Sequence, residues 1–158
     1  GHALAHRAFE QGITIAEKIA GADPKPVLDD TVPQVVFSFP EAASVGLTLD
    51  QAKAREDVVE PKETAYPMLS NARMLMSGEG GSMTVVSGAF ANNPDMQVVL
   101  GVHIVSPIAS DLIAEAEQLV GNRVPLADAA RLIHPHPTFS ETLGEALLKA
   151  DGRPLHTR

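Results

Sequence analysis

His136 and Glu141 lie five positions apart near the end of the chain, and these two residue types can together form a catalytic base. A histidine titrates near neutral pH, so its ring can take up and release a proton under ordinary conditions. A carboxylate on one ring nitrogen fixes the tautomer and stabilises the imidazolium that forms when the other nitrogen is protonated. The spacing therefore predicts His136 as a general base and Glu141 as the group that orients it.

The same segment also has the pattern of a helix start. Thr138-Phe139-Ser140-Glu141 matches the T-x-x-E capping box, in which the Glu141 side chain accepts a hydrogen bond from the Thr138 backbone N–H. The spacing gives the capping box and the catalytic pair about equal weight, so both interpretations stay open. In either case we expect Thr138 to cap a final helix that ends near Lys149.

Three other polar residues are weaker candidates for a site. His134 and His136 form an H-x-H pair, but a zinc site needs three or four ligands and the spacing fixes no third. We therefore predict no metal site and interpret His134 as a structural neighbour in the turn. His103 lies in an apolar stretch, where a hydrogen-bonded core histidine is expected rather than a catalytic one. Glu145, one helical turn beyond Glu141, is expected to be a solvated or capping acid.

Composition restricts the class of protein. The chain has 158 residues, 44% of them hydrophobic and 20% charged, which suits one folded domain, and it has no cysteine for a disulfide scaffold. Its net charge of −8 argues against nucleic acid or an anionic membrane as a partner, since both favour clustered Lys and Arg. No apolar run approaches the ~20 residues of a membrane-spanning helix, and no signal-peptide pattern is present. We therefore expect a cytoplasmic protein.

Hydrophobic periodicity divides the chain into three parts. Residues 1–20 show helical spacing of apolar side chains, with Gly12 as the candidate break. Residues 21–31 contain glycine and two prolines and are predicted to be a linker. Residues 32–158 are predicted to form the main domain.

Within the main domain, strand-forming residues and turn residues predict a sheet. The expected strands are 35–39, 57–66, 82–90 and 97–105. Asn92-Asn93-Pro94-Asp95 is turn chemistry and predicts a hairpin between the last two strands. The methionines at 68, 74, 76 and 83 are interpreted as packing residues, inside the domain or at a contact with a second chain, rather than as a cofactor site.

Helices are predicted between and after these strands. A T-x-x-Q sequence predicts that Thr48 caps a short helix through Ala54. An apolar stripe predicts an amphipathic helix over 108–120, and a shorter helix is expected at 126–132. Strands followed by packed helices predict an α+β fold, with a mainly antiparallel β-sheet covered on one face and other surface free for a partner.

Four blocks of the sequence resemble the dihydrolipoamide dehydrogenases, which belong to the class I pyridine nucleotide-disulfide oxidoreductases. Residues 134–141 resemble the H-x-H-P-T-x-S-E motif of that family, and residues 33–48 resemble the P-x-V-x-F-T-x-P-E-x-A-x-V-G-L-T block that opens its interface domain. Residues 101–109 resemble its G-x-H-I-V block, and residues 4–12 resemble the helix that ends its FAD domain. Four blocks in the same order are far more specific than any one of them.

The resemblance implies an active site shared between two subunits. Residues 32–158 would be the dimerisation domain, and residues 1–20 would be the last helix of an FAD-binding domain. In the homodimer, His136 and Glu141 of one subunit would serve the disulfide and flavin of the other. His136 would deprotonate a thiol of dihydrolipoamide, free or on a lipoyl domain, and electrons would pass through FAD to NAD. The residues implied to contact FAD are Ala3, which replaces the usual methionine, Leu4, Ala5 and His6.

Other parts of such an enzyme are missing from the sequence. Without cysteine there is no redox-active disulfide, and no G-x-G-x-x-G motif is present for FAD or NAD. We therefore expect this chain to be a fragment of a dihydrolipoyl dehydrogenase that is roughly three times as long. The fragment should bind no cofactor and should not turn over by itself. Two alternatives stay open: the interface domain of another flavin disulfide reductase, such as a glutathione-reductase-like enzyme, and a non-catalytic dimerisation module.

Overall fold

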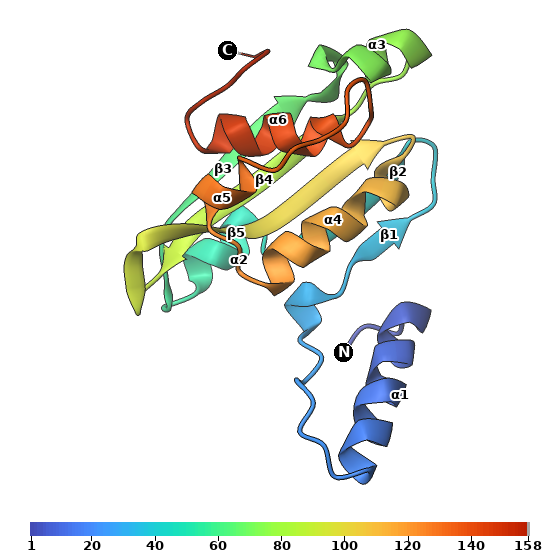
Figure 1. Cartoon of the computed structure of the whole chain (residues 1–158), viewed down its shortest axis with the longest axis vertical. Coiled ribbons are helices and arrows are strands. Elements are labelled where there is room, and N and C mark those ends of the chain that lie inside the picture. The colour runs from blue at the N-terminus through green and yellow to red at the C-terminus, as the bar shows by residue number, and fades with distance from the viewer. Residues whose placement is uncertain (158) are drawn as a thin grey trace.

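A five-stranded antiparallel sheet with helices packed on it forms the centre of the computed structural model, which describes residues 1–157 (Figure 1). The strand order is β1-β2-β5-β4-β3, and every neighbouring pair is antiparallel. The strands are β1 (Gln34–Val36), β2 (Glu41–Gly46), β3 (Val58–Pro67), β4 (Ser82–Phe90) and β5 (Asn93–Ser106). The predicted α+β fold with an antiparallel sheet is confirmed.

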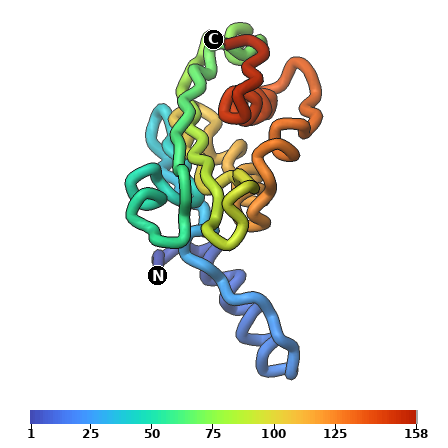
Figure 2. The backbone as a smooth tube through the Cα atoms, turned by 90° about the vertical axis from the view of Figure 1, so that its left-hand side faces the viewer, coloured from blue at the N-terminus to red at the C-terminus, as the bar shows by residue number. Residues whose placement is uncertain are grey.

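The α-helices within residues 1–157 are α1 (Ala5–Ile19), α2 (Leu49–Ala54), α3 (Ala72–Ser77), α4 (Ala109–Gly121), α5 (Leu126–Ala129) and α6 (Glu141–Ala150). Helix α1 runs through Gly12 without the candidate break, because a single glycine weakens a helix without ending it. Helix α1 and the segment that follows it extend away from the sheet (Figure 2).

Helices cover one face of the sheet and part of the other. Successive side chains of a strand point to opposite faces, and the adjacent residues Val85 and Val86 of β4 accordingly belong to different buried clusters. The larger cluster, with Val85, lies beneath α4, which packs on β2 and β5, and α6, which packs on β3 and β4. The smaller cluster contains Val86 and Ala52 of α2. The expectation of a sheet covered on one face only is therefore incomplete.

The predicted helix caps and hairpin are largely confirmed. Thr48 caps α2 through a complete capping box with Gln51. Strands β4 and β5 form the expected hairpin, but its turn is shorter than predicted, because Phe90 already pairs with Asn93. The strand expected over 35–39 ends at Val36, since the chain must turn before β2 can return beside it.

Two elements were not expected from the sequence. Strand β2 lies between β1 and β5, although its Ala-Ala-Ser stretch has weak strand propensity. Helix α3 begins after Asn71, whose side chain accepts a hydrogen bond from the Met74 N–H. Met68, Met74 and Met83 are fully buried packing residues, whereas Met76 is 68% exposed and does not pack inside the subunit.

Candidate active site

His136 lies in the loop between α5 and α6, with its ring directed out of the subunit. Its Nδ1 donates a hydrogen bond to Oε1 of Glu141, the first residue of α6, at 2.9 Å. The His136 side chain is 70% exposed, whereas that of Glu141 is 19% exposed. The pair expected from the spacing is thus in contact, and its Nε2 is the nitrogen that an external group can reach. The catalytic role of the pair stays a prediction.

Glu141 also bonds to the backbone of the loop. Its second oxygen, Oε2, accepts the Thr138 N–H at 2.7 Å. The two interpretations of the sequence therefore describe one carboxylate, which serves His136 and Thr138 at the same time. Burial acts to raise the pKa of Glu141, but the hydrogen bonds from Thr138 and His136 outweigh it, so the pKa lies below its ordinary value of 4.5. The group is ionised at neutral pH.

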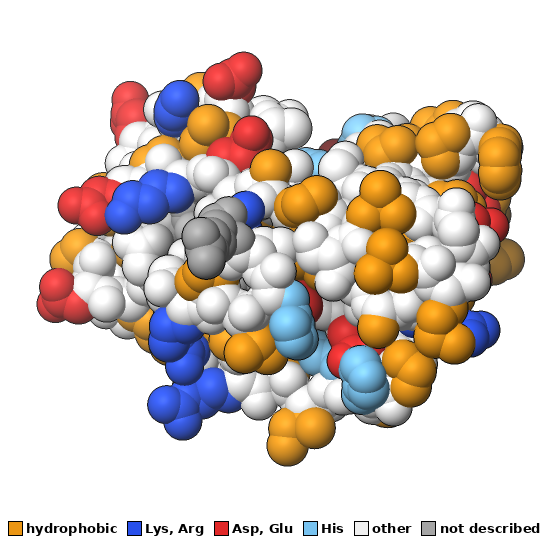
Figure 3. Space-filling view, turned by 90° about the horizontal axis from the view of Figure 1, so that it is seen from above, with side chains coloured by type: hydrophobic (Ala, Val, Ile, Leu, Met, Phe, Trp, Pro, Cys, Tyr) orange, Lys and Arg blue, Asp and Glu red, His pale blue; other side chains and the backbone are white. Residues whose placement is uncertain are grey.

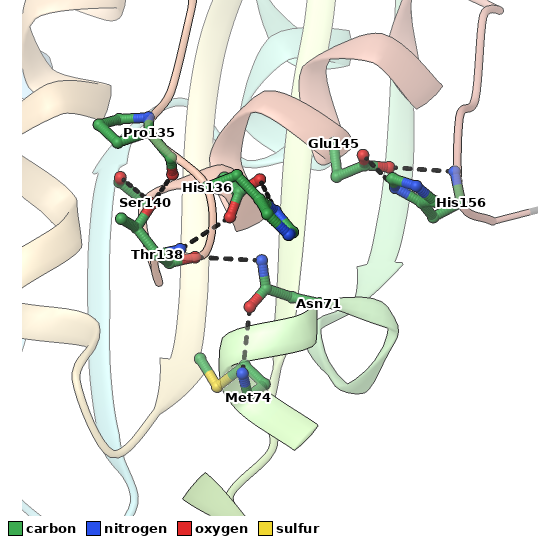
Figure 4. Close-up of polar contacts among 9 residues, drawn as sticks. Asn71, Met74, Pro135, His136, Thr138, Ser140, Glu145 and His156 are labelled. Atoms are coloured by element: carbon green, nitrogen blue, oxygen red, sulfur yellow. Dashed lines mark hydrogen bonds and ion pairs between the residues drawn. The ribbon is translucent and has the colours of Figure 1, made fainter. Parts of the chain in front are cut away.

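The expected capping role of Thr138 is wrong in one respect. Helix α6 begins at Glu141, and Ser140 occupies the N-cap without a side-chain cap. The Thr138 hydroxyl instead donates to the Pro135 carbonyl at 2.6 Å, which closes a turn before the helix (Figure 4). The carbonyl of Thr138 accepts a hydrogen bond from the Asn71 side chain at 3.2 Å, so the loop is also tied to the start of α3.

His134 points into the subunit, where its ring binds a carboxylate of a neighbouring helix. Its Nε2 donates to Oε1 of Glu115 in α4 at 2.7 Å, and its side chain is 10% exposed. The hydrogen bond to Glu115 raises the pKa of His134 above its ordinary value, with burial opposing this. No group of three or more metal-ligating side chains occurs within residues 1–157.

Glu145 is not solvated, contrary to the expectation, and binds the C-terminal segment. It is 8% exposed and accepts both the Nδ1–H of His156 at 2.7 Å and the backbone N–H of His156 at 3.2 Å (Figure 4).

The buried Tyr66 hydroxyl has no hydrogen-bond partner in the described part of the chain. Burial, with added repulsion from Glu145 and Glu141, raises the pKa of Tyr66 to about 12. Tyr66 is therefore a neutral hydroxyl near two carboxylates.

His103 is hydrogen-bonded, as expected, but only half-buried. Its Nδ1 accepts from the Ser44 hydroxyl at 2.6 Å, and its Nε2 donates to the Leu47 carbonyl at 3.1 Å. Both ring nitrogens are occupied, so His103 has no free nitrogen with which to act as a base.

The residues implied to contact FAD lie at the start of α1. Ala3 and Leu4 line a cavity of about 490 Å³ against β1, β2 and β5. His6 instead donates through Nε2 to the Pro33 carbonyl at 2.7 Å. Leu4 is the N-cap of α1 and provides no side-chain cap, so the first backbone N–H groups of this helix, from Ala5 onward, are open to an external acceptor.

Exposed apolar side chains lie around α3 and the loop between α5 and α6. In Figure 3 they gather on the side where α3 lies, next to histidine side chains. We call this set the apolar surface; its members are Leu69, Leu75, Met76, Leu132, Ile133 and Leu155. Exposed apolar side chains that gather on one side of a molecule are typical of a surface that binds another protein. Within residues 1–157, no helix is long and apolar enough to span a membrane.

Sequence reasoning missed the hydrogen-bond partners of His134 and Glu145. Glu115 lies 19 residues before His134, and His156 lies 11 residues after Glu145. Both separations are too long for a contact within one helix or one strand, so only the packed structure brings them together. The one available signal was the glycine at 152, which allows the chain to turn back after α6.

Comparison with known proteins gives a consistent result. Residues 32–147 match the dimerisation domain of the pyridine nucleotide-disulphide oxidoreductases. The chain is 40% identical over 157 residues to a dihydrolipoyl dehydrogenase of Bacillus subtilis, covering 99% of this chain and 32% of that protein. It is also 40% identical over 158 residues to the dihydrolipoyl dehydrogenase of Cupriavidus necator, covering 99% of this chain and 31% of that one.

A solved structure agrees with these sequence matches. The crystal structure of LpdA from Mycobacterium tuberculosis aligns with a TM-score of 0.83 and 29% identity, covering 93% of this chain and 31% of LpdA. The chain thus spans about a third of the length of the relatives that it matches.

Proposed function

The chain belongs to the pyridine nucleotide-disulphide oxidoreductases, whose dimerisation domain it contains, and from this we propose that it is the histidine-bearing part of a dihydrolipoyl dehydrogenase. The activity is that of a longer flavoprotein, here called the parent flavoprotein, which would join this domain to FAD- and NAD-binding domains. Its substrate would be dihydrolipoamide, free or carried by a lipoyl domain. The dithiol would be oxidised to the disulfide, and NAD would accept the two electrons.

The exposed, oriented imidazole of His136 carries this proposal. Glu141 occupies Nδ1 at 2.9 Å, and Nε2 remains for a substrate thiol. Removal of the thiol proton by Nε2 yields the thiolate, which is the species that attacks a disulfide. Glu141 stabilises the imidazolium that results, because its carboxylate is already ionised and in place.

A second subunit would complete the site. The chain has no cysteine, so the disulfide that accepts the substrate electrons must come from elsewhere. His136 is 70% exposed and lies beside the apolar surface, where a partner subunit would bury both. A homodimer related by two-fold symmetry brings the same surface of both chains together and forms two equivalent sites.

In this chain only the start of α1 would contact FAD, and the rest of the FAD and NAD sites would lie in the other domains. FAD, when bound to the parent flavoprotein, relays the two electrons from the reduced disulfide to NAD. The open N–H groups at Ala5 and His6 can donate to a flavin oxygen, and Ala3 and Leu4 offer apolar contact. The sequence holds no glycine-rich phosphate loop, so the nucleotide portions belong to the other domains.

A substitution in the parent flavoprotein tests the base. His136→Gln keeps a polar side chain of similar size but cannot take a proton at neutral pH, so NAD-linked oxidation of dihydrolipoamide should fall by roughly several hundredfold or more. The control is His156→Gln, which alters another histidine paired with a carboxylate of α6, outside the loop. Unchanged turnover in His136→Gln would refute the proposed role.

A mixing experiment tests whether the site is shared. His136→Gln subunits are unfolded and refolded together with subunits that lack a redox cysteine in the FAD domain. A heterodimer then contains one complete site, formed by the intact histidine of one chain and the intact disulfide of the other, so activity should reappear. If mixing restores nothing while heterodimers form, the site is not shared between subunits.

A further inference from the structure

We propose that His134 is a positioning residue, which anchors the loop so that His136 meets both Glu141 and the substrate. The inference rests on the proposed role of His136 as the base. His134 would act through its packing against α4 and α6 and would not touch the substrate.

Burial along the loop singles out His134. Residues 131–137 are all exposed except His134, whose side chain is 10% exposed. Ile133, immediately before it, is 97% exposed. His134 is therefore the side chain of this stretch that is buried in its own subunit, and it anchors the stretch there beside the contact of His136 with Glu141.

Two helices form the socket of His134. Glu115 of α4 accepts its Nε2–H at 2.7 Å. Gly144 of α6 lies against the Nδ1–Cε1 edge of the ring, since a Cβ atom at that position would lie 2.6 Å from His134 Nδ1 and 2.9 Å from its Cε1. Glycine is unfavourable inside a helix relative to alanine, so its presence at position 144 is explained by the space that the imidazole needs.

The socket is linked directly to the catalytic pair. Gly144 lies three residues after Glu141 on α6, so the two residues are neighbours along the same helix. His134 precedes His136 by two residues. A shift of the His134 ring would therefore change the position of His136 relative to Glu141, and reaction rates are sensitive to small displacements of a catalytic group.

Steady-state kinetics of the parent flavoprotein separate positioning from folding. In His134→Ala the kcat for dihydrolipoamide oxidation should fall about tenfold to a hundredfold, with a much smaller change in KM. His134→Gln should recover much of this loss, because its amide N–H can still donate to Glu115. The control is His156→Ala, which removes a histidine–carboxylate contact of the same length, 2.7 Å, elsewhere on α6. A normal kcat in His134→Ala, with only a lower melting temperature, would overturn the inference.

A double-mutant cycle tests the socket itself. Helix propensity alone predicts that Gly144→Ala is harmless, but the added methyl group would displace His134, so kcat should fall. In the His134→Ala background the clash is absent, and Gly144→Ala should cause no further loss. Independent, multiplicative losses in the double variant would show that the two positions are not coupled.

A spectroscopic readout on the 158-residue chain does not depend on activity. Long-range proton–nitrogen NMR of the histidine rings reports which nitrogen of His136 carries the proton. Glu141 should hold that proton on Nδ1, and His134→Ala should shift the signal toward a mixture of tautomers. An unchanged His136 signal would overturn the inference. If His136→Gln retains full activity in the parent flavoprotein, it is instead the proposed function that fails.

Discussion

The Glu141 carboxylate and the His136 imidazole lie 2.9 Å apart through Oε1 and Nδ1. The second carboxylate oxygen accepts the Thr138 N–H at 2.7 Å, so both oxygens are occupied on the loop that precedes α6. One side chain therefore orients the imidazole and ties down the backbone two residues beyond it. Removal of the charge would loosen both.

A Glu141→Gln variant should accordingly lose activity while the base remains. The amide has one acceptor oxygen instead of two and no charge to stabilise the imidazolium, so kcat for dihydrolipoamide oxidation should fall about a hundredfold. The rate is measured in the parent flavoprotein beside His136→Gln. Because His136 is still present, the loss should be the smaller of the two, and a loss equal to that of His136→Gln would contradict a purely orienting role.

Local patterns account for much of the fold and for the central pair of the site. The apolar stripe of α4 and the capping box of Thr48 depend on residues within one or two turns, so they can be recognised from spacing. His136 and Glu141 are only five positions apart and follow the same logic. Strand β2 escapes recognition because its small residues are held in place by β1 and β5 on either side, a tertiary effect that outweighs strand propensity.

Contacts across the fold account for what the spacing could not predict. Glu145 has the pattern of an exposed helical acid, yet the returning C-terminal segment covers it with His156. His134 has the pattern of a turn residue, yet Glu115 of α4 accepts its hydrogen bond. The partner of Glu145 comes from the returning C-terminal segment, and the partner of His134 comes from a helix packed on the sheet; no local repeat encodes either contact.

The pair of His134 and Glu115 should make stability depend on pH. The folded-state pKa of His134 is raised above its ordinary value of 6.5, so the folded protein binds the proton more tightly than the unfolded chain. The added stability is fully present below about pH 6.5 and is lost as the pH rises through the folded-state pKa. Urea unfolding of the wild type and His134→Gln should therefore differ more at low pH than at high pH. A difference that grows toward alkaline pH would contradict the shift.

The cap of α2 offers a local test of stability away from the site. The Thr48 hydroxyl accepts the Gln51 N–H at 3.2 Å, and the Gln51 side chain accepts the Thr48 N–H at 2.9 Å. Thr48→Ala removes one of these bonds and should lower the free energy of unfolding by about 1 kcal/mol. Thr48→Ser keeps the hydroxyl and serves as the control. Chemical denaturation followed by circular dichroism measures both, and equal stability of the two variants would show that the cap contributes nothing.

Association of the chain should depend on the apolar surface, and Ile133 is its most exposed member at 97%. Full burial of such a side chain stabilises a contact by about 1.5–3 kcal/mol, so Ile133→Asp should weaken a dimer by at least about tenfold. Met96→Asp is the control, since Met96 is also exposed, at 37%, but lies at the hairpin end of β5, outside the apolar surface.

Light scattering at micromolar concentration should show a dimer for the wild type and Met96→Asp, and a shift toward monomer for Ile133→Asp. A wild type that is only monomeric would contradict a dimer formed by this domain alone, and equal weakening by both substitutions would place the contact elsewhere. Ile133 lies on the same loop as His136. Loss of the dimer would therefore also remove the partner subunit from His136.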